Sequence, residues 1–98
     1  MSIVSVSRWA VSPEQALPIA KEVAAILKEH GAISVRFGPC FAGPDTGAVF
    51  VAITYPDWES FGAAQQALSA DADWQRLYKE ALQIGELQDR SLIVAEEL

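Results

Sequence analysis

The 98-residue sequence is poor in the residues that usually build metal, redox and nucleophilic sites. It has one cysteine, Cys40, and one histidine, His30. A single cysteine cannot form an internal disulfide, and one thiol with one imidazole supplies too few ligands for a zinc site. The sequence also has no glycine-rich phosphate-binding loop and no set of serine, histidine and aspartate at a catalytic spacing. We therefore expect neither a metal ion nor a cofactor.

Basic residues and long apolar runs are also scarce. Seven lysines and arginines are dispersed along the chain against thirteen acidic residues, which gives a net charge of −6. An acidic protein repels phosphate groups, so nucleic acids and anionic membranes are poor partners. No apolar run approaches the ~18 residues of a membrane helix, and no basic leader precedes a long apolar run. The simplest expectation is one cytoplasmic domain that spans residues 1–98.

The most informative stretch is an uncharged segment at residues 48–55. Gly47 precedes it and Pro56 follows it, and its β-branched and aromatic content predicts a strand. In this strand, one face carries Val49, Val51, Ile53 and Tyr55, and the other carries Ala48, Phe50, Ala52 and Thr54. Because only Thr54 is clearly polar, we expect both faces of the strand to be covered.

Alternation and helical periodicity predict the remaining elements. Strands are expected at residues 3–9, 33–37, 48–55 and 90–95, and helical regions at residues 13–30 and 58–82. Ser12 is typical of a helix start and Gly31 of a helix end. The second helical region is interrupted at residues 69–73, where Asp71 or Asp73 can cap a new segment.

The order of these elements is β-α-β-β-α-β. Two right-handed crossovers then place two helices on one face of a four-stranded antiparallel sheet, which is the ferredoxin-like α+β fold. The two helices leave the other face of the sheet uncovered, although the strand at residues 48–55 is apolar on that side too. A second copy of the same sheet is the simplest cover. We therefore expect a homodimer that packs through the sheet face.

Four short stretches resemble a known superfamily. They are WAVSP at residues 9–13, FAGPDTG at 41–47, DWESF at 57–61 and DADWQ at 71–75. With the element order, they resemble the dimeric α/β-barrel superfamily, which includes antibiotic-biosynthesis monooxygenases, haem-degrading monooxygenases and muconolactone isomerases. The last three stretches look like an uncharacterised bacterial branch of that group. The resemblance covers nearly the whole chain and implies the fold and the dimer, but it says little about the reaction.

The resemblance does not extend to the active site of the haem-degrading members. Those proteins look as if they use an asparagine on the first strand together with a tryptophan and a histidine on the helical side. This sequence contains no asparagine, and residues 58–82 contain no histidine. The haem-degrading site therefore cannot be carried over to this chain.

Aromatic residues are more abundant than packing alone requires in a chain of this length. In the superfamily a pocket often lies between the sheet and the helices, so the resemblance implies an aromatic-lined pocket for a small hydrophobic ligand. The aromatic candidates for ligand contacts are Trp9, Phe50, Trp74 and Tyr78. Ordinary packing in the core and the interface is the alternative. Tyr78 has the best claim to a polar role, because a buried phenol needs a partner.

Arg36 is the charged candidate for the ligand site. It alternates with apolar residues within 33–37, so it faces away from them and toward the dimer side if they meet the helices. It could bind a carboxylate or enolate of a ligand, or pair across the interface with an acidic residue such as Asp45 or Glu96. The same alternatives hold for two arginines expected at strand edges, Arg8 and Arg90.

His30 and Cys40 each allow a chemical and a structural interpretation. His30 could be a general base or a haem ligand, or it could interact with the last carbonyls of the first helix. Cys40 could be a catalytic thiol only with a nearby base, and it otherwise behaves as a small hydrophobic residue.

Two functional hypotheses remain open. The first is a non-catalytic protein that binds a small hydrophobic molecule without converting it, or an assembly module in which the same pocket is filled. The alternative is a cofactor-independent monooxygenase or isomerase that acts on an activated aromatic or enolisable substrate through Arg36 and Tyr78. The scarcity of titratable groups favours the first hypothesis, and the resemblance favours the second.

Overall fold

The computed structural model describes residues 1–44 and 46–98. Within these ranges the elements are β1 (Ser2–Ala10), α1 (Pro13–Glu29), β2 (Ser34–Pro39), β3 (Val49–Tyr55), α2 (Trp58–Ser69), α3 (Ala72–Ile84) and β4 (Glu86–Ala95). The strands form an antiparallel sheet in the order β2-β3-β1-β4. This confirms the ferredoxin-like α+β fold predicted from the sequence. The second helical unit consists of two consecutive helices, because the chain breaks between Ser69 and Ala72.

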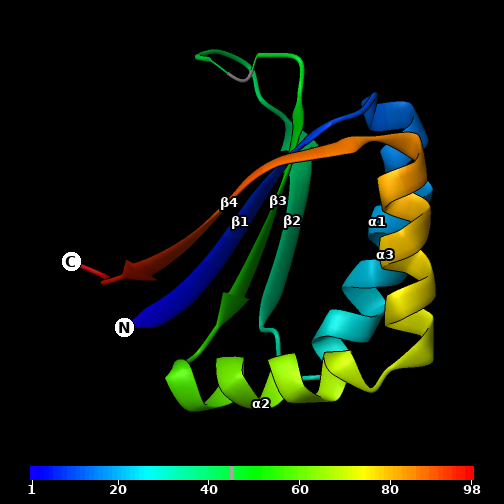
Figure 1. Cartoon of the computed structure of the whole chain (residues 1–98). Coiled ribbons are helices and arrows are strands. Elements are labelled where there is room, and N and C mark those ends of the chain that lie inside the picture. The colour runs from blue at the N-terminus through cyan, green and yellow to red at the C-terminus, as the bar shows by residue number, and fades with distance from the viewer. Residues whose placement is uncertain (45) are drawn as a thin grey trace.

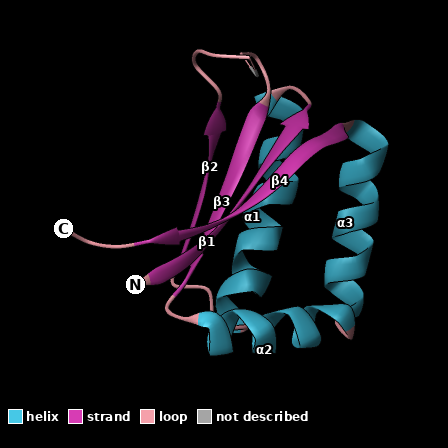
Figure 2. Cartoon of the chain, turned by 60° about the vertical axis from the view of Figure 1, so that its left-hand side comes forward, coloured by secondary structure: helices cyan, strands magenta, loops and turns pink. Residues whose placement is uncertain are grey.

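The helices all lie on one side of the sheet. Helices α1 and α3 run side by side along it, and α2 crosses at the end where β3 finishes (Figures 1 and 2). No helix covers the opposite face of the sheet in the part of the chain that the structure describes (Figure 2). None of the helices in this part combines the length and the apolar character needed to cross a membrane.

Side-chain caps set the starts of α1, α2 and α3 as their sequences predict. Ser12 accepts a hydrogen bond from the backbone N–H of Gln15 at 3.2 Å, and Pro13 follows at the first helical position. Asp57 and Asp71 cap α2 and α3 in the same way. At the other end of α1, Gly31 has a φ of +102°, a conformation that glycine adopts without steric cost.

Strand β4 begins four residues before the predicted start at residue 90. Its first residues pair with the end of β1, where Leu87 lies opposite Trp9 and Glu86 opposite Ala10. The register of this pairing shifts between Arg8 and Trp9, which indicates a β-bulge. Residues 86–89 lack apolar alternation, so their strand conformation comes from backbone pairing with β1 and not from a local pattern.

Two groups of buried side chains fill the space between the sheet and the helices. One contains Ile3, Leu27, Tyr55 and Leu68 and joins β1 and β3 to α1 and α2. The other is centred on Trp9 and Val49 at the opposite end of the sheet. These groups fix the helices against the strands and define the walls of the space between them.

The uncovered face of the sheet is largely apolar and only partly shielded. Val4 and Val6 of β1 lie opposite Thr54 and Ala52 of β3, and all four side chains are half-buried. Ile93 of β4 lies opposite Val4 and is 45% exposed. The sequence predicts that both faces of β3 are covered, and within the described part of the chain the helices cover one of them.

Candidate functional site

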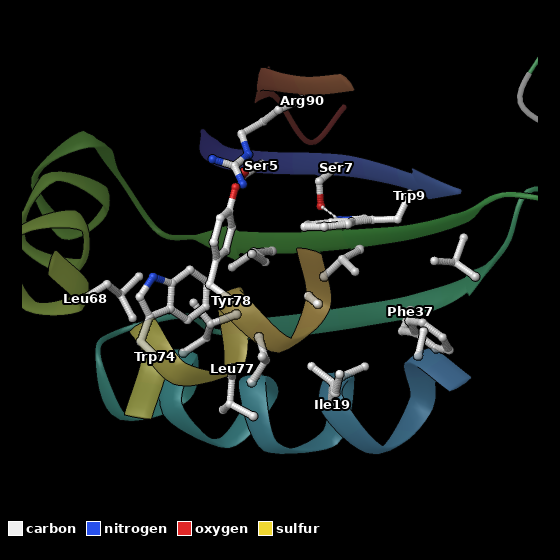
Figure 3. A pocket seen from close by; sticks show the side chains of 18 of the residues that line it. Ser5, Ser7, Trp9, Ile19, Phe37, Leu68, Trp74, Leu77, Tyr78 and Arg90 are labelled. Atoms are coloured by element: carbon white, nitrogen blue, oxygen red, sulfur yellow. Dashed lines mark hydrogen bonds between the residues drawn. The ribbon is translucent and has the colours of Figure 1, made fainter. Parts of the chain in front are cut away.

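A cavity with a volume of about 120 Å³ lies between the sheet and the helices. Its walls come from the helix-facing sides of β1 and β3 and from α1 and α3 (Figure 3). Most of the lining is apolar: Val11, Ala16, Ile19, Ala20, Val23, Phe37, Val49, Val51, Ile53, Leu77 and Ala81. Both groups of buried side chains contribute to it, so the cavity is part of the interior of the chain.

Three aromatic rings form a row along the cavity. Trp9 and Tyr78 meet edge to face, with ring centroids 6.0 Å apart and an angle of 76° between the ring planes. Tyr78 and Trp74, one turn apart on α3, also have centroids 6.0 Å apart. The indole N–H of Trp9 donates a hydrogen bond of 2.9 Å to the hydroxyl of Ser7. This bond satisfies the polar atoms of both buried residues and fixes the Trp9 ring.

Polar groups gather at one end of this row. In Figure 3, the hydroxyl of Tyr78 and the guanidinium of Arg90 point toward each other, close to Ser5. Arg90 lies opposite Ser7 in the β1–β4 pairing, which places its side chain on the helix-facing side. Arg90 is the one charged side chain among the described residues that line the cavity. The cavity thus has an apolar body and a cationic end.

The structure brings together three of the five candidate residues from the sequence. Trp9, Trp74 and Tyr78 line the cavity. Arg36 and Phe50 do not, because they alternate with cavity residues and point to the uncovered face of the sheet. These two residues are therefore separated from the cavity by the sheet itself.

The arginines occupy three different environments. Arg36 is exposed and has no carboxylate partner among the described residues, while Asp45, one of its proposed partners, lies outside them. Glu96, the other, lies 3.9 Å from the N-terminal amine. On the uncovered face, Arg8 forms an ion pair of 2.9 Å with Asp89. Arg90, placed at a strand edge by the sequence, is in the middle of β4 and lines the cavity.

The sequence contained one signal that could have identified Arg90. Arg90 is separated by two and by four residues from Leu92 and Val94, so all three side chains lie on the same face of the strand. Any pairing that turns Leu92 and Val94 toward the helices therefore also turns Arg90 toward the helices. The relation between β4 and β1, however, depends on the bulge beside Arg8, which no local pattern indicates.

His30 has a structural position outside the cavity. It is the C-cap of α1, and its Nε2 lies 3.0 Å from Oδ2 of Asp71, the N-cap of α3. The hydrogen bond from His30, with a second one from the backbone N–H of Trp74, holds the pKa of Asp71 below its ordinary value. These contacts join two helix ends and favour the structural interpretation of His30.

Cys40 extends the β2–β3 pairing by one residue. Its N–H donates to the carbonyl of Ala48 at 2.7 Å, and its carbonyl accepts from the N–H of Gly47. Its side chain is half-buried. Within residues 1–44 and 46–98, no group of three histidine, cysteine, aspartate or glutamate side chains is placed to hold a metal ion.

The fold and the cavity define a class: a small ferredoxin-like α+β protein, with the fold of the dimeric α/β-barrel superfamily, that carries an aromatic-lined cavity between its sheet and its helices. The chain belongs to the family described as Domain of unknown function (DUF6854), whose model matches residues 2–91. No curated protein sequence matches the chain significantly.

Solved structures share the fold over nearly the whole chain. A variant of SnoaB, a cofactor-independent oxygenase from Streptomyces nogalater, is 14% identical with a TM-score of 0.75, covering 99% of this chain and 95% of that one. An uncharacterised NIPSNAP domain protein from Burkholderia xenovorans is 17% identical with a TM-score of 0.71, covering 96% and 94%. A dimeric ferredoxin-like protein from an uncultured marine organism is 15% identical with a TM-score of 0.70, covering 98% of each chain. At these identities the comparisons show the fold, which is the fold that the sequence resemblance implied.

Proposed function

We propose that the protein binds a small hydrophobic molecule in the cavity between its sheet and its helices. The observation that supports this proposal is the row of aromatic rings formed by Trp9, Tyr78 and Trp74 along an apolar cavity of about 120 Å³. For comparison, an engineered apolar cavity of about 150 Å³ in another protein binds benzene. The volume therefore suits a ligand whose buried part is about the size of one aromatic ring.

The lining favours binding over acid–base chemistry. Its titratable groups among the described residues are Tyr55, Tyr78 and Arg90. Burial raises the pKa of Tyr55, so its phenol is neutral at physiological pH. Arginine also keeps its proton under these conditions. A site of this composition holds and orients a ligand more readily than it removes a proton from one.

Ala20 of α1 offers a direct test of this proposal. It lines the cavity, so the Ala20→Leu substitution should occupy part of the space that a ligand needs. We expect the wild-type protein to show a raised melting temperature with phenol, benzyl alcohol or phenylacetate. We expect Ala20→Leu to weaken the binding by at least about tenfold, measured by calorimetry.

Ala25→Leu is the matched control, because Ala25 is an exposed residue of the same helix and does not line the cavity. It should bind as the wild type does. Equal binding by Ala20→Leu and the wild type, with both proteins folded by circular dichroism, would place the ligand elsewhere and contradict the proposal.

A second candidate function is cofactor-independent oxygenation or isomerisation of an enolisable substrate. The observation that favours it is the position of Arg90 and the Tyr78 hydroxyl at one end of the cavity, where they could stabilise an enolate. The shared fold with SnoaB is consistent with it. This candidate requires oxygen consumption or isomerisation of a bound substrate, with loss of turnover in Tyr78→Phe while the fold is retained.

We also infer that the protein is a homodimer that packs through the uncovered face of the sheet. The half-buried apolar side chains of β1 and β3 on that face support this, as does the dimeric ferredoxin-like protein that shares the fold. In such a dimer the cavities of the two protomers lie on the outer sides of the paired sheets, so each protomer holds its own ligand.

A further inference from the structure

The polar end of the cavity has an unbalanced charge. Arg8 pairs with Asp89 at 2.9 Å and Arg76 pairs with Glu80 at 3.1 Å, but Arg90 has no carboxylate within ion-pair distance among the described residues. This holds although the chain carries thirteen acidic residues against seven basic ones. A guanidinium beside an apolar cavity therefore keeps its hydrogen-bonding capacity free for a ligand.

The neighbouring hydroxyl groups are also free. Tyr78 and Ser5 line the cavity beside Arg90, and neither side chain forms a hydrogen bond within the described part of the chain. The hydroxyl of Ser7 differs, because it accepts the indole N–H of Trp9. Arg90 can only donate hydrogen bonds, and both free hydroxyls can donate as well. The end of the cavity is thus suited to an oxygen atom that accepts several hydrogen bonds and carries negative charge.

We propose that the ligand is an organic carboxylate with a ring-sized hydrophobic body. This deepens the proposed function and rests on it. The body occupies the apolar part of the cavity against Trp9 and Trp74, and the carboxylate lies at the polar end beside Arg90. There it accepts two hydrogen bonds from the fork of Arg90 and one from Tyr78.

The size of the cavity sets the class of the carboxylate. Pockets for drug-sized ligands usually enclose roughly 300–1,000 Å³. At about 120 Å³, this cavity accepts one ring or a short branched chain and excludes a fused polycyclic body. An arylacetate or a short branched carboxylate has the required size and charge.

Arg90 is exposed, and this moderates the expected effect of its charge. A buried charge-assisted hydrogen bond contributes more than an exposed ion pair, which solvent and salt screen. At the polar end of the cavity, we expect a ligand with a carboxylate to bind about tenfold more tightly than a neutral ligand of the same shape. We also expect added salt to reduce this advantage without weakening the neutral ligand.

The experiment compares phenylacetate with phenylacetamide, which has the same shape without the charge. Calorimetry on the protein measures both affinities, and the fluorescence of Trp9 and Trp74 provides a second signal from the cavity. We expect phenylacetate to bind about tenfold more tightly than phenylacetamide, and Arg90→Gln to remove this preference, chiefly by weakening the binding of phenylacetate. Arg90→Lys should retain part of the preference, because it keeps the charge and loses the fork.

Arg76→Gln is the matched control, since it removes the same charge from the exposed side of α3 and should keep the full preference. Equal affinity for the two ligands in the wild type, or an unchanged preference in Arg90→Gln, overturns the carboxylate assignment and leaves the hydrophobic-binding function standing. Failure of phenylacetate, phenylacetamide and the neutral probes to bind at all overturns both proposals.

Discussion

Gly85 joins the end of α3 to the start of β4 at a point where two stretches of backbone are very close. A Cβ atom built on Gly85 would lie 2.7 Å from Cβ of Val11 and 2.9 Å from the carbonyl oxygen of Ala10. Both contacts are shorter than van der Waals separations, and they involve atoms that cannot rotate away. The close approach lets β4 enter the sheet beside β1 directly after the helix.

The first prediction is that Gly85→Ala destabilises the protein. The added methyl group must push the β1–α1 turn away from the end of α3, which should cost about 1–3 kcal/mol in the free energy of unfolding. Urea denaturation followed by circular dichroism measures the change.

Gly62→Ala provides the control for this prediction. Gly62 lies within α2 with open space around it, and alanine is the better helix former, so this substitution should stabilise by about 0.5–1 kcal/mol. A Gly85→Ala protein as stable as the wild type would mean that the turn moves freely and that the close approach has no structural role.

At the residue scale, the sequence predicts the strand face on which a side chain lies better than it predicts the residues that this side chain contacts. Alternation put Arg36 on the opposite face of its strand from Phe37, and Phe50 on the opposite face from Val49; in the structure Phe37 and Val49 line the cavity, and Arg36 and Phe50 do not. It could not show that the guanidinium of Arg90 points toward the hydroxyl of Tyr78, because this arrangement brings β4 and α3 together through a pairing register set elsewhere.

At the scale of whole elements, the contact between His30 and Asp71 joins the end of α1 to the start of α3. The carboxylate of Asp71 accepts one hydrogen bond from His30 Nε2 at 3.0 Å and another from the N–H of Trp74 at 3.0 Å. The two helices are the walls of the cavity opposite the sheet. This contact therefore helps to hold the cavity in shape.

The second prediction concerns the pH dependence of this contact. The hydrogen bonds lower the pKa of Asp71 in the folded protein, while the unfolded chain keeps the ordinary value of 3.8. Above 3.8 both states are ionised and the stabilisation is complete. As the pH falls, the carboxyl group binds a proton in the unfolded state before it does so in the folded state. The stabilisation therefore decreases below pH 3.8 and is lost once the pH falls below the lowered pKa of the folded state. Asp71→Asn keeps a capping residue but removes this titration, and its loss of stability between neutral pH and about pH 3 should be smaller.

Urea midpoints at the two pH values measure this difference. Asp73→Asn is the control, because Asp73 lies in the first turn of the same helix, is exposed and makes no contact with His30. It should show the wild-type dependence. If Asp71→Asn loses as much stability in acid as the wild type, the ionised carboxylate of Asp71 does not stabilise the fold through these hydrogen bonds.

The helix starts were predictable because capping is local. Ser12 and Asp71 act on N–H groups only three residues away, so the sequence alone is sufficient to locate them. The start of β4 was not predictable, since residues 86–89 become a strand only through pairing with residues of β1 some eighty positions earlier. Local chemistry sets the helices of this fold, and distant pairing sets its last strand.

At the scale of the whole molecule, the chain is a slab of two layers. Its extents are 37 × 32 × 18 Å, and the short dimension corresponds to one sheet with one layer of helices. A face of 37 × 32 Å is large enough for the ~800 Å² that each partner of a standard protein interface buries. The apolar side chains on this face have no cover within the described chain, which is why a second copy is the expected partner.

The last prediction follows from the position of Val6 on this face. It is a half-buried residue of β1, opposite Ala52 of β3, and its side chain has no role in the cavity. Val6→Asp should leave the protomer folded, because the new carboxylate stays in contact with water in a single chain. In a dimer the two-fold axis would bury the carboxylate twice without a partner, at a cost of about 1–3 kcal/mol each. We therefore expect light scattering to find a wild-type dimer and a Val6→Asp monomer at micromolar concentration, with ligand binding retained.

Ala63→Asp adds the same charge to the exposed surface of α2 and should remain dimeric. A monomeric wild type would refute the pairing of sheets. A Val6→Asp protein that stays dimeric would show that the copies meet elsewhere, and the exposed outer strand β4, with Leu92, Ile93 and Val94 each about half exposed, would then be the next surface to test. In either case the cavity lies on the helix side of its own protomer, so the oligomeric state and the ligand site can be measured independently.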